Sequence, residues 1–100
     1  MMDSLVERIE DWAHARGLLD EANINPDRQY MKLVEEVGEL GAGMARGDMM
    51  ETQDAIGDIV VVLTILSYQL GASLPACVQY AVEEIEGRTG KTVNGVFIKD

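Results

Sequence analysis

A long apolar segment in the middle of the chain sets the strongest limit on how this sequence can fold. Within Glu51–Leu70 no turn residue interrupts the pattern except a lone Gly57, and the centre reads IVVVLTIL (residues 59–66). β-Branched residues favour a strand here, but a pattern of this length exceeds the usual strand of about 3–10 residues. We therefore predict a helix, starting at Met49 or Met50, that is buried on nearly all sides. A short α/β fold with residues 59–66 as a buried strand is the alternative.

Other parts of the chain have apolar residues at helical spacing. The predicted helices are Ser4–Arg16, Pro26–Arg46 and Ser73–Glu86. Asn25 precedes Pro26, which is typical of a helix start, because the asparagine side chain accepts hydrogen bonds from the first turn and proline has no N–H to leave unpaired. Together with the long central helix these make four helices, joined by short connections. We therefore predict an all-α single domain over residues 1–100, folded as an antiparallel four-helix bundle.

The predicted helices carry apolar stripes that we expect to face the core of this bundle. On the second helix the stripe consists of Tyr30, Leu33, Val37, Leu40 and Met44. On the fourth it consists of Leu74, Val78, Ala81 and Ile85. The tail GRTGKTVNGVFIKD differs in character, and its Asn94-Gly95 pair between short apolar runs predicts a turn or small hairpin.

Charge and composition exclude several classes of function. The chain has 18 Asp+Glu against 8 Lys+Arg, a formal net charge of -10, which argues against a nucleic-acid partner because phosphate contacts need a basic surface. The single cysteine excludes a disulfide framework. The start MMDSLVERIEDW lacks a signal-peptide apolar run, and residues 55–66 are too short to cross a bilayer. We expect a cytoplasmic protein without a membrane partner, whose remaining apolar surface is buried in a homodimer or homotetramer.

The run VEEVGEL places acidic side chains close together on the second helix. Glu36 and Glu39 are three residues apart and Glu35 and Glu39 four apart, so they lie on neighbouring turns of one side. Like charges at these spacings repel by a few tenths of a kcal/mol per pair. An acidic run of this kind on its own is usually a solvated face.

A second pair of acids occurs on the long apolar helix. Asp54 and Asp58 are four residues apart, and the face beyond Asp58 is wholly apolar. A carboxylate in that position is costly unless a positive charge compensates it, and no Lys or Arg lies between Asp48 and Gln69. A divalent cation would compensate both helices. Oxygen ligands without a cysteine or histidine cluster favour Mg²⁺, with Mn²⁺ as an alternative.

The residues that carry these acids resemble a known family. The run KLVEEVGELGAGMARGD followed by DAIGDIVVVLTIL is similar to the all-α nucleoside triphosphate pyrophosphohydrolases of the MazG-like type, whose pattern is E-x-x-E on one helix and E-x-x-D on the next. Glu36 and Glu39 match the first half, and Asp58 matches the end of the second. The tail is similar to that of small single-domain members often encoded by bacteriophages. The position three before Asp58 departs from the pattern, since it holds Ala55, with Asp54 as the adjacent acid.

The resemblance implies hydrolysis of a nucleoside triphosphate between its α- and β-phosphates, which gives a monophosphate and pyrophosphate. The predicted metal ligands are Glu36, Glu39, Asp54 and Asp58. Bound ions would neutralise phosphate oxygens and activate water near neutral pH, and Glu35 or Glu36 could accept the proton of that water. The alternative is a catalytically degenerate helical module that binds a nucleotide or a protein.

Positively charged and amide side chains supply candidates for contacts with the nucleotide. Lys32 lies one turn before Glu36 on the second helix, and the other candidates come from the tail. The predicted substrate-binding residues are Lys32, Arg88, Lys91 and Asn94. Each has an alternative explanation as surface charge or turn chemistry.

Overall fold

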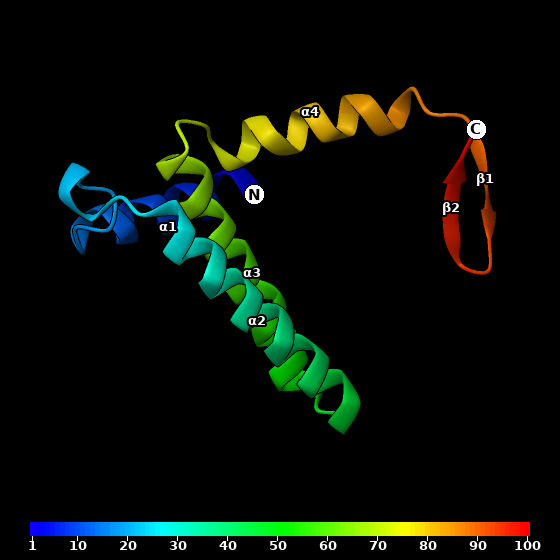
Figure 1. Ribbon diagram of the computed structural model, residues 1–100, viewed down its shortest axis with the longest axis horizontal. Helices are drawn as coiled ribbons and strands as arrows, with labels where there is room; N and C mark the ends of the chain where they lie inside the picture. Colours follow the sequence, from blue (N-terminus) through cyan, green and yellow to red (C-terminus); the bar gives the residue numbers. More distant parts are fainter.

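The computed structural model describes all 100 residues as helices followed by one hairpin (Figure 1). The elements are α1 (Met2–Ala15), a 3-10 turn (Glu21–Asn23), α2 (Pro26–Arg46), α3 (Met49–Gln69), α4 (Leu74–Glu86), β1 (Gly90–Val93) and β2 (Val96–Lys99). The mostly helical class and the hairpin tail are therefore confirmed. The alternative of a strand at residues 59–66 is wrong, because these residues lie inside α3.

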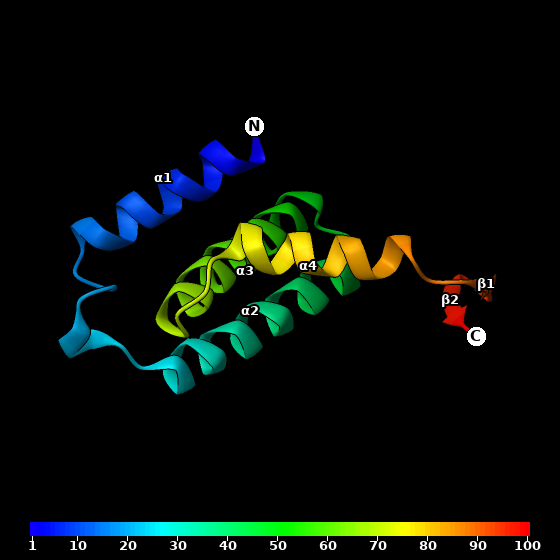
Figure 2. The same ribbon diagram turned by 90° about the horizontal axis from the view of Figure 1, so that it is seen from above.

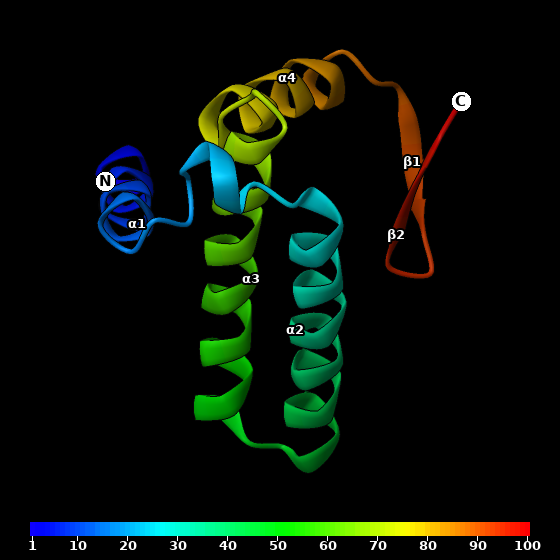
Figure 3. The ribbon, with the colours of Figure 1, turned by 60° about the vertical axis from the view of Figure 1, so that its left-hand side comes forward.

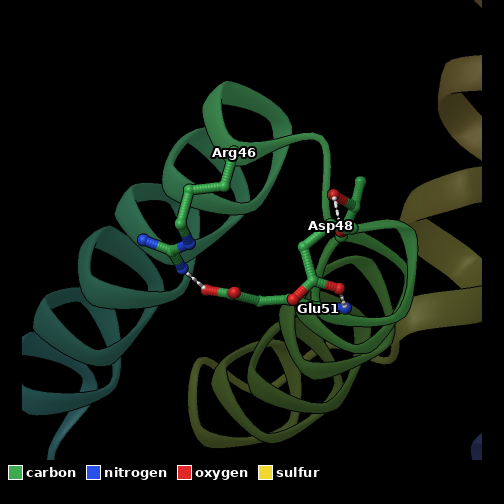
Figure 4. Close-up of polar contacts among 4 residues, drawn as sticks. Arg46, Asp48 and Glu51 are labelled. Atoms are coloured by element: carbon green, nitrogen blue, oxygen red, sulfur yellow. Dashed lines mark hydrogen bonds and ion pairs between the residues drawn. The ribbon is translucent and has the colours of Figure 1, made fainter.

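The helices α2 and α3 form an antiparallel pair that is the centre of the molecule (Figure 3). Between them Gly47 adopts a left-handed conformation with φ of 66°, which ends α2 at little steric cost. Asp48 then caps α3, since its side chain accepts a hydrogen bond of 3.0 Å from the backbone N–H of Glu51. Arg46 forms an ion pair with Glu51 across the same turn (Figure 4).

A glycine allows α2 and α3 to approach closely near this turn. Gly43 is buried, and a Cβ added there would lie 3.0 Å from Thr52 Oγ1 and 3.1 Å from Thr52 N. Two turns earlier on the same face of α2 stands Glu36. The close contact therefore aims the side of α2 that carries Glu36 at α3.

The segment IVVVLTIL is a helix because α3 is covered on several sides. Every residue from 58 to 67 is buried or half-buried. The hydroxyl groups in this run form hydrogen bonds within α3. That of Thr64 donates to the carbonyl of Val60 at 2.8 Å, and that of Ser67 donates to the carbonyl of Thr64 at 2.9 Å. Tertiary packing thus overrides the strand propensity of the β-branched residues.

Helix α1 packs on the outer side of α3, away from α2 (Figure 2). Ala13 of α1 and Ile65 of α3 meet with Leu19 of the connection in a small buried cluster. The helix begins at Met2 rather than at the predicted Ser4. Ser4 caps nothing, because its hydroxyl donates to the carbonyl of Met1.

One side chain joins the α1–α2 connection to the end of α3. The amide of Gln69 donates to the carbonyl of Leu18 at 3.1 Å and accepts from the backbone N–H of Asn25 at 3.2 Å. Asn25 in turn caps α2 by accepting from the N–H of Arg28. Gln69 therefore fixes where α2 starts relative to α3.

We expect Gln69→Ala to destabilise the protein by about 1–2 kcal/mol, since the carbonyl of Leu18 loses a partly buried partner and the N–H of Asn25 loses an exposed one. The midpoint of urea unfolding, followed by circular dichroism, measures this loss. Gln53→Ala is the matched control, because Gln53 is an exposed glutamine of the same helix. Equal midpoints for the two variants would contradict the assigned role of Gln69.

Helix α4 departs from the other helices. The chain turns through 101° between α3 and α4, and α4 leads away from the end of the α2–α3 pair (Figures 1 and 3). No residue of α4 is buried, and Val78 and Ile85 are 51% and 56% exposed. The predicted inward stripe of α4 therefore has no core to face within this chain, and the structure does not confirm the four-helix bundle.

The hairpin at the end of the chain has the predicted turn. Strands β1 and β2 pair antiparallel, with Val93 opposite Val96. Asn94 and Gly95 between them have φ values of 51° and 79°, the two positive values that a tight hairpin of this kind requires. Both strands are exposed along their whole length.

No single helix has both the length and the apolar character needed to span a bilayer. Only α3 and α4 taken together reach that composition, across their 101° bend.

Candidate metal centre

Three carboxylates come together where α2 faces α3. One oxygen each of Glu36, Glu39 and Asp58 lies within 4.8 Å of the others. The two glutamates stand on adjacent turns of α2, and Asp58 enters from α3 at the start of its covered section. The structure thus brings together acids that are about twenty residues apart in the sequence, as predicted for Glu36, Glu39 and Asp58.

Glu36 is the most enclosed member of this acidic cluster. Its exposed fraction is 9%, and its Oε2 atom is buried without any hydrogen-bond partner. Burial raises the pKa of Glu36 above its ordinary value, and the nearby charges of Glu39 and Asp58 raise the pKa further. Only the charge of Lys32 acts in the opposite direction. A buried, unpaired carboxylate oxygen is unusual, because most buried polar atoms have a partner.

Asp58 has a similar environment on the α3 side. It is half-buried, and burial raises the pKa of its carboxyl group, as do the charges of Asp54 and Glu39. Lys32 again lowers the pKa. The two perturbed carboxyl groups of the molecule therefore lie in one place and share their neighbours.

The geometry of the acidic cluster fits one hard divalent cation after a small adjustment. Each Mg²⁺–oxygen distance is about 2.1 Å, so two ligands of one ion lie at most about 4.2 Å apart. The carboxylate oxygens lie within 4.8 Å of one another, so a slight rotation of the side chains brings them within this distance. A cation there would also give Glu36 Oε2 the partner that it lacks.

The remaining predicted site residues on α2 and α3 lie beside the acidic cluster. Asp54 is exposed and outside the group of three, although it is close enough to raise the pKa of Asp58. Glu35 is exposed on the side of α2 and forms an ion pair of 3.8 Å with Lys32. Lys32 is the one positive charge that lowers the pKa of both Glu36 and Asp58.

The structure does not bring the tail residues to the acidic cluster. Arg88, Lys91 and Asn94 are all exposed and lie beyond α4. Strands β1 and β2 pack only against each other (Figure 1). Within one chain, therefore, only Lys32 of the predicted substrate-binding residues stands near the carboxylates.

Ala55 occupies a buried position on the same side of α3 as Asp58. Its exposed fraction is 2%, and it precedes Asp58 by three residues, so the two share a face of the helix. In the MazG-like pattern E-x-x-D, this position is the one that carries the third acid. Asp54, one residue earlier, points to solvent instead.

An apolar groove lies between α1 and α3. Its volume is 850 Å³, and its lining includes Leu5, Ile9, Trp12, Ile56, Val61 and Asp58. Trp12 is 44% exposed, with the guanidinium carbon of Arg16 4.5 Å from its ring centre. Asp58 is therefore a member of the acidic cluster and also one of the residues that line this groove.

Residue spacing alone does not reveal this groove. Leu5, Ile9 and Trp12 stand at helical spacing in the sequence, which indicates that α1 has an apolar face. That spacing does not say which helix the face meets, so the groove became visible only when α1 was placed against α3.

Comparison with known proteins adds one relative and no stated activity. An uncharacterized 18.2 kDa protein from the rep-hol intergenic region of Haemophilus phage HP1 (strain HP1c1) is 40% identical to this chain over 68 residues. The match covers 68% of this chain but 40% of the phage protein, so it spans less than half of that relative's length. No family model matches the chain, and no solved structure matches it.

Proposed function

We propose that this chain is a Mg²⁺-dependent nucleoside triphosphate pyrophosphohydrolase that releases pyrophosphate and a nucleoside monophosphate. The observation that supports this most is the buried, unpaired Oε2 of Glu36, which points to a ligand missing from the protein itself. One carboxylate oxygen each of Glu36, Glu39 and Asp58 lies within 4.8 Å of the others. The MazG-like pattern of these same residues supplies the reaction.

Glu36, Glu39 and Asp58 would hold the ion, with Asp54 next to them as the additional acid. A bound Mg²⁺ supplies charge neutralisation for phosphate oxygens and lowers the pKa of water. Lys32 adds a positive charge beside the same carboxylates and is 58% exposed, so it remains accessible to a phosphate. A net charge of -10 makes this local compensation necessary, because the chain as a whole repels a triphosphate.

We assign Glu35 as the general base. Glu36 belongs to the metal-binding group, whereas Glu35 lies outside it and keeps a carboxylate free for proton transfer. Its ion pair with Lys32 at 3.8 Å is exposed and can open when substrate arrives. In this arrangement Glu35 would accept the proton of the attacking water, and an ion held by the acidic cluster would supply the positive charge that the phosphates need.

The groove between α1 and α3 would take the nucleoside. Asp58 is common to the lining of the groove and the acidic cluster, so we infer that a nucleotide with its phosphates at the cluster places its base in the apolar groove near Trp12. An aromatic ring flanked by Arg16 offers a stacking surface for any base. This arrangement would give affinity for nucleotides without fixing the identity of the base.

The test is a panel of ribonucleoside and deoxyribonucleoside triphosphates with Mg²⁺, assayed separately for pyrophosphate and orthophosphate. We expect at least one nucleotide to give pyrophosphate and no orthophosphate. Trp12 is the only tryptophan, so its fluorescence reports nucleotide binding in the groove at the same time. Release of orthophosphate, or no release from any nucleotide, would contradict the proposed reaction.

The alternative function is a helical module that binds a nucleotide without hydrolysing it. The buried Ala55 favours this alternative, because it removes an acid from the metal-binding side of α3. A change in Trp12 fluorescence on nucleotide addition, together with no pyrophosphate from the whole panel, would support the module over the enzyme.

A further inference from the structure

Helix α3 contains one glycine, Gly57, and the backbone of the helix does not require it. Glycine makes a helix less stable than alanine does, because it loses more conformational freedom on folding. Gly57 lies inside α3, away from both caps of the helix. It is not among the glycines with a positive φ, so another residue could adopt the same backbone conformation.

Close packing, the other usual reason for a glycine in a helix, is also absent at Gly57. A Cβ added at Gly57 would find open space, with no heavy atom of another side chain or element within 4 Å. A Cβ added at Gly43 would lie 3.0 Å from Thr52 Oγ1. Gly43 therefore serves the contact between α2 and α3, whereas no contact within the protein explains Gly57.

The open space beside Gly57 belongs to the groove between α1 and α3. Helix α1 lies alongside α3 here (Figure 2). The wall that α3 contributes to the groove consists of Gln53, Ile56, Gly57, Asp58, Val60 and Val61. Gln53, Gly57 and Val61 follow each other at steps of four, so they share one side of the helix. Gly57 is thus in the middle of this wall, and Asp58 of the acidic cluster is its neighbour in the chain.

We propose that Gly57 is a specificity-determining residue, against whose bare backbone the sugar of the nucleotide lies. This inference rests on the proposed function, in which the phosphates lie at the acidic cluster and the base lies near Trp12. The sugar joins the phosphates to the base, so it has to pass the part of α3 beside Asp58. Gly57 is the residue there that has no side chain in the way.

The residues around Gly57 explain why a side chain would obstruct the sugar. Gln53 and Val61 stand one turn before and one turn after Gly57, and both line the groove. The glycine therefore leaves a gap in the wall about one side chain long. A side chain at this position would fill the gap, but it would leave the carboxylates of Glu36, Glu39 and Asp58 in place. Substitution of Gly57 should therefore weaken binding of the nucleoside part without weakening binding of the phosphates.

The variants Gly57→Ala and Gly57→Leu test this proposal by calorimetric titration in Mg²⁺. The probes are the α,β-imido triphosphates of adenosine, guanosine, cytidine and uridine, each with and without its 2′-hydroxyl, which carry nitrogen in the bond to be cleaved. We expect at least one of them to bind the wild type. Its dissociation constant should rise by about 5- to 100-fold in the variants, the range for inserting a side chain into a well-fitted contact. Leucine should have the larger effect.

Inorganic tripolyphosphate is the matched control ligand, because it carries phosphates but neither sugar nor base. In Mg²⁺ it should bind Gly57→Ala and Gly57→Leu as tightly as it binds the wild type. Equal weakening of tripolyphosphate and of the nucleotide analogue would overturn the proposal, since it would show that the substitution acts on the acidic cluster and not on the sugar.

Thermal stability supplies a readout that does not depend on any ligand. Gly57→Ala should raise the melting temperature by about 4–8 °C, because alanine favours the helix and its Cβ meets open space. Gly38→Ala is the matched control variant, since Gly38 is an exposed glycine of α2 that also has open space around it and lies outside the groove. It should gain similar stability and bind the nucleotide analogue as the wild type does. A lower melting temperature in Gly57→Ala would overturn the proposal, because Gly57 would then serve the fold.

Failure of this inference can be told apart from failure of the proposed function. If the wild type binds an analogue and both Gly57 variants bind it equally well, the inference is overturned and the proposed function stands. If the wild type binds none of the analogues in Mg²⁺, both are overturned. A more stable Gly57→Ala that keeps its affinity for tripolyphosphate and loses affinity for the analogue would support the assigned role of Gly57.

Discussion

Glu36→Gln is expected to abolish pyrophosphate release and, at the same time, to make the metal-free protein more stable. Glutamine has nearly the same shape but no charge, so the repulsion from Glu39 and Asp58 disappears together with the burial of an unpaired carboxylate. We expect a gain of about 1 kcal/mol, at the lower end of the cost of an unsatisfied buried polar group. A residue that served the fold alone would lose stability when changed.

The loss of activity should be large. Replacing residues that merely orient metal ligands typically costs about 10–100-fold, so loss of a ligand itself should exceed about 100-fold. Glu39→Gln should also abolish turnover while the fold survives. Initial rates of pyrophosphate release and thermal melts in EDTA measure both quantities on the same samples.

Glu86→Gln is the matched control for these variants, because Glu86 is an exposed acid at the end of α4, outside the acidic cluster. It should leave rate and melting temperature close to those of the wild type. A Glu36→Gln variant with turnover within about tenfold of wild type would remove Glu36 from the metal site, since even supporting residues cost that much.

Magnesium is expected to raise the melting temperature of the wild type by about 10 °C or more at pH 7.5. An ion at a hundred times its dissociation constant stabilises the folded state by about 2.7 kcal/mol. Each kcal/mol corresponds to about 4–8 °C for a domain of this size. A bound ion would also remove the repulsion that the carboxylates of the acidic cluster exert on each other in the metal-free protein.

Without metal, the same carboxylates should make the protein less stable as the pH rises. The pKa values of Glu36 and Asp58 are raised in the folded state above their ordinary values of 4.5 and 3.8. Between the ordinary and the raised values the folded state binds more protons than the unfolded state, so stability falls with increasing pH. The stabilising contribution is complete below the ordinary values and is lost once the pH passes the raised ones.

The effect of magnesium should therefore grow over the same pH window, because protons compete with the ion for the carboxylates. Melting curves from pH 4 to pH 8, with Mg²⁺ or with EDTA, measure both trends. The double variant Glu36→Gln with Asp58→Asn should remove the magnesium effect and flatten the EDTA curve. Identical wild-type melting temperatures with and without Mg²⁺ at pH 7.5 would contradict a metal centre at this position.

Much of the local structure was predictable because its signals are local. Asn25 and Pro26 begin α2, Gly47 ends it, and Asn94-Gly95 makes the hairpin turn, each through backbone chemistry that acts over a few residues. The ambiguous run at residues 59–66 needed the length of its surroundings to be assigned as a helix. The start of α1 was predicted less well. Serine often caps a helix, but the hydroxyl of Ser4 donates to the carbonyl of Met1 instead.

The candidate site was predictable only in part. Spacing on α2 placed Glu36 beside Glu39, and the apolar neighbours of Asp58 marked that residue as needing compensation. Spacing could not show that Asp54 stays exposed while Ala55 faces the interior. Nor could it show that Lys91 and Asn94 stand on a hairpin that touches no helix.

The sequence by itself determined the helical segments, their ends and the acids that share one side of α2, since each depends on periodicity and on contacts within a few residues. Only the tertiary structure decided that α2 and α3 bring Glu36, Glu39 and Asp58 within 4.8 Å, and that α1 forms a groove with α3 whose lining includes Asp58. It also decided that the stripe of α4 is left without a core. An apolar stripe specifies that a helix must be covered, but the spatial arrangement of the whole chain, and of any second copy, determines by what.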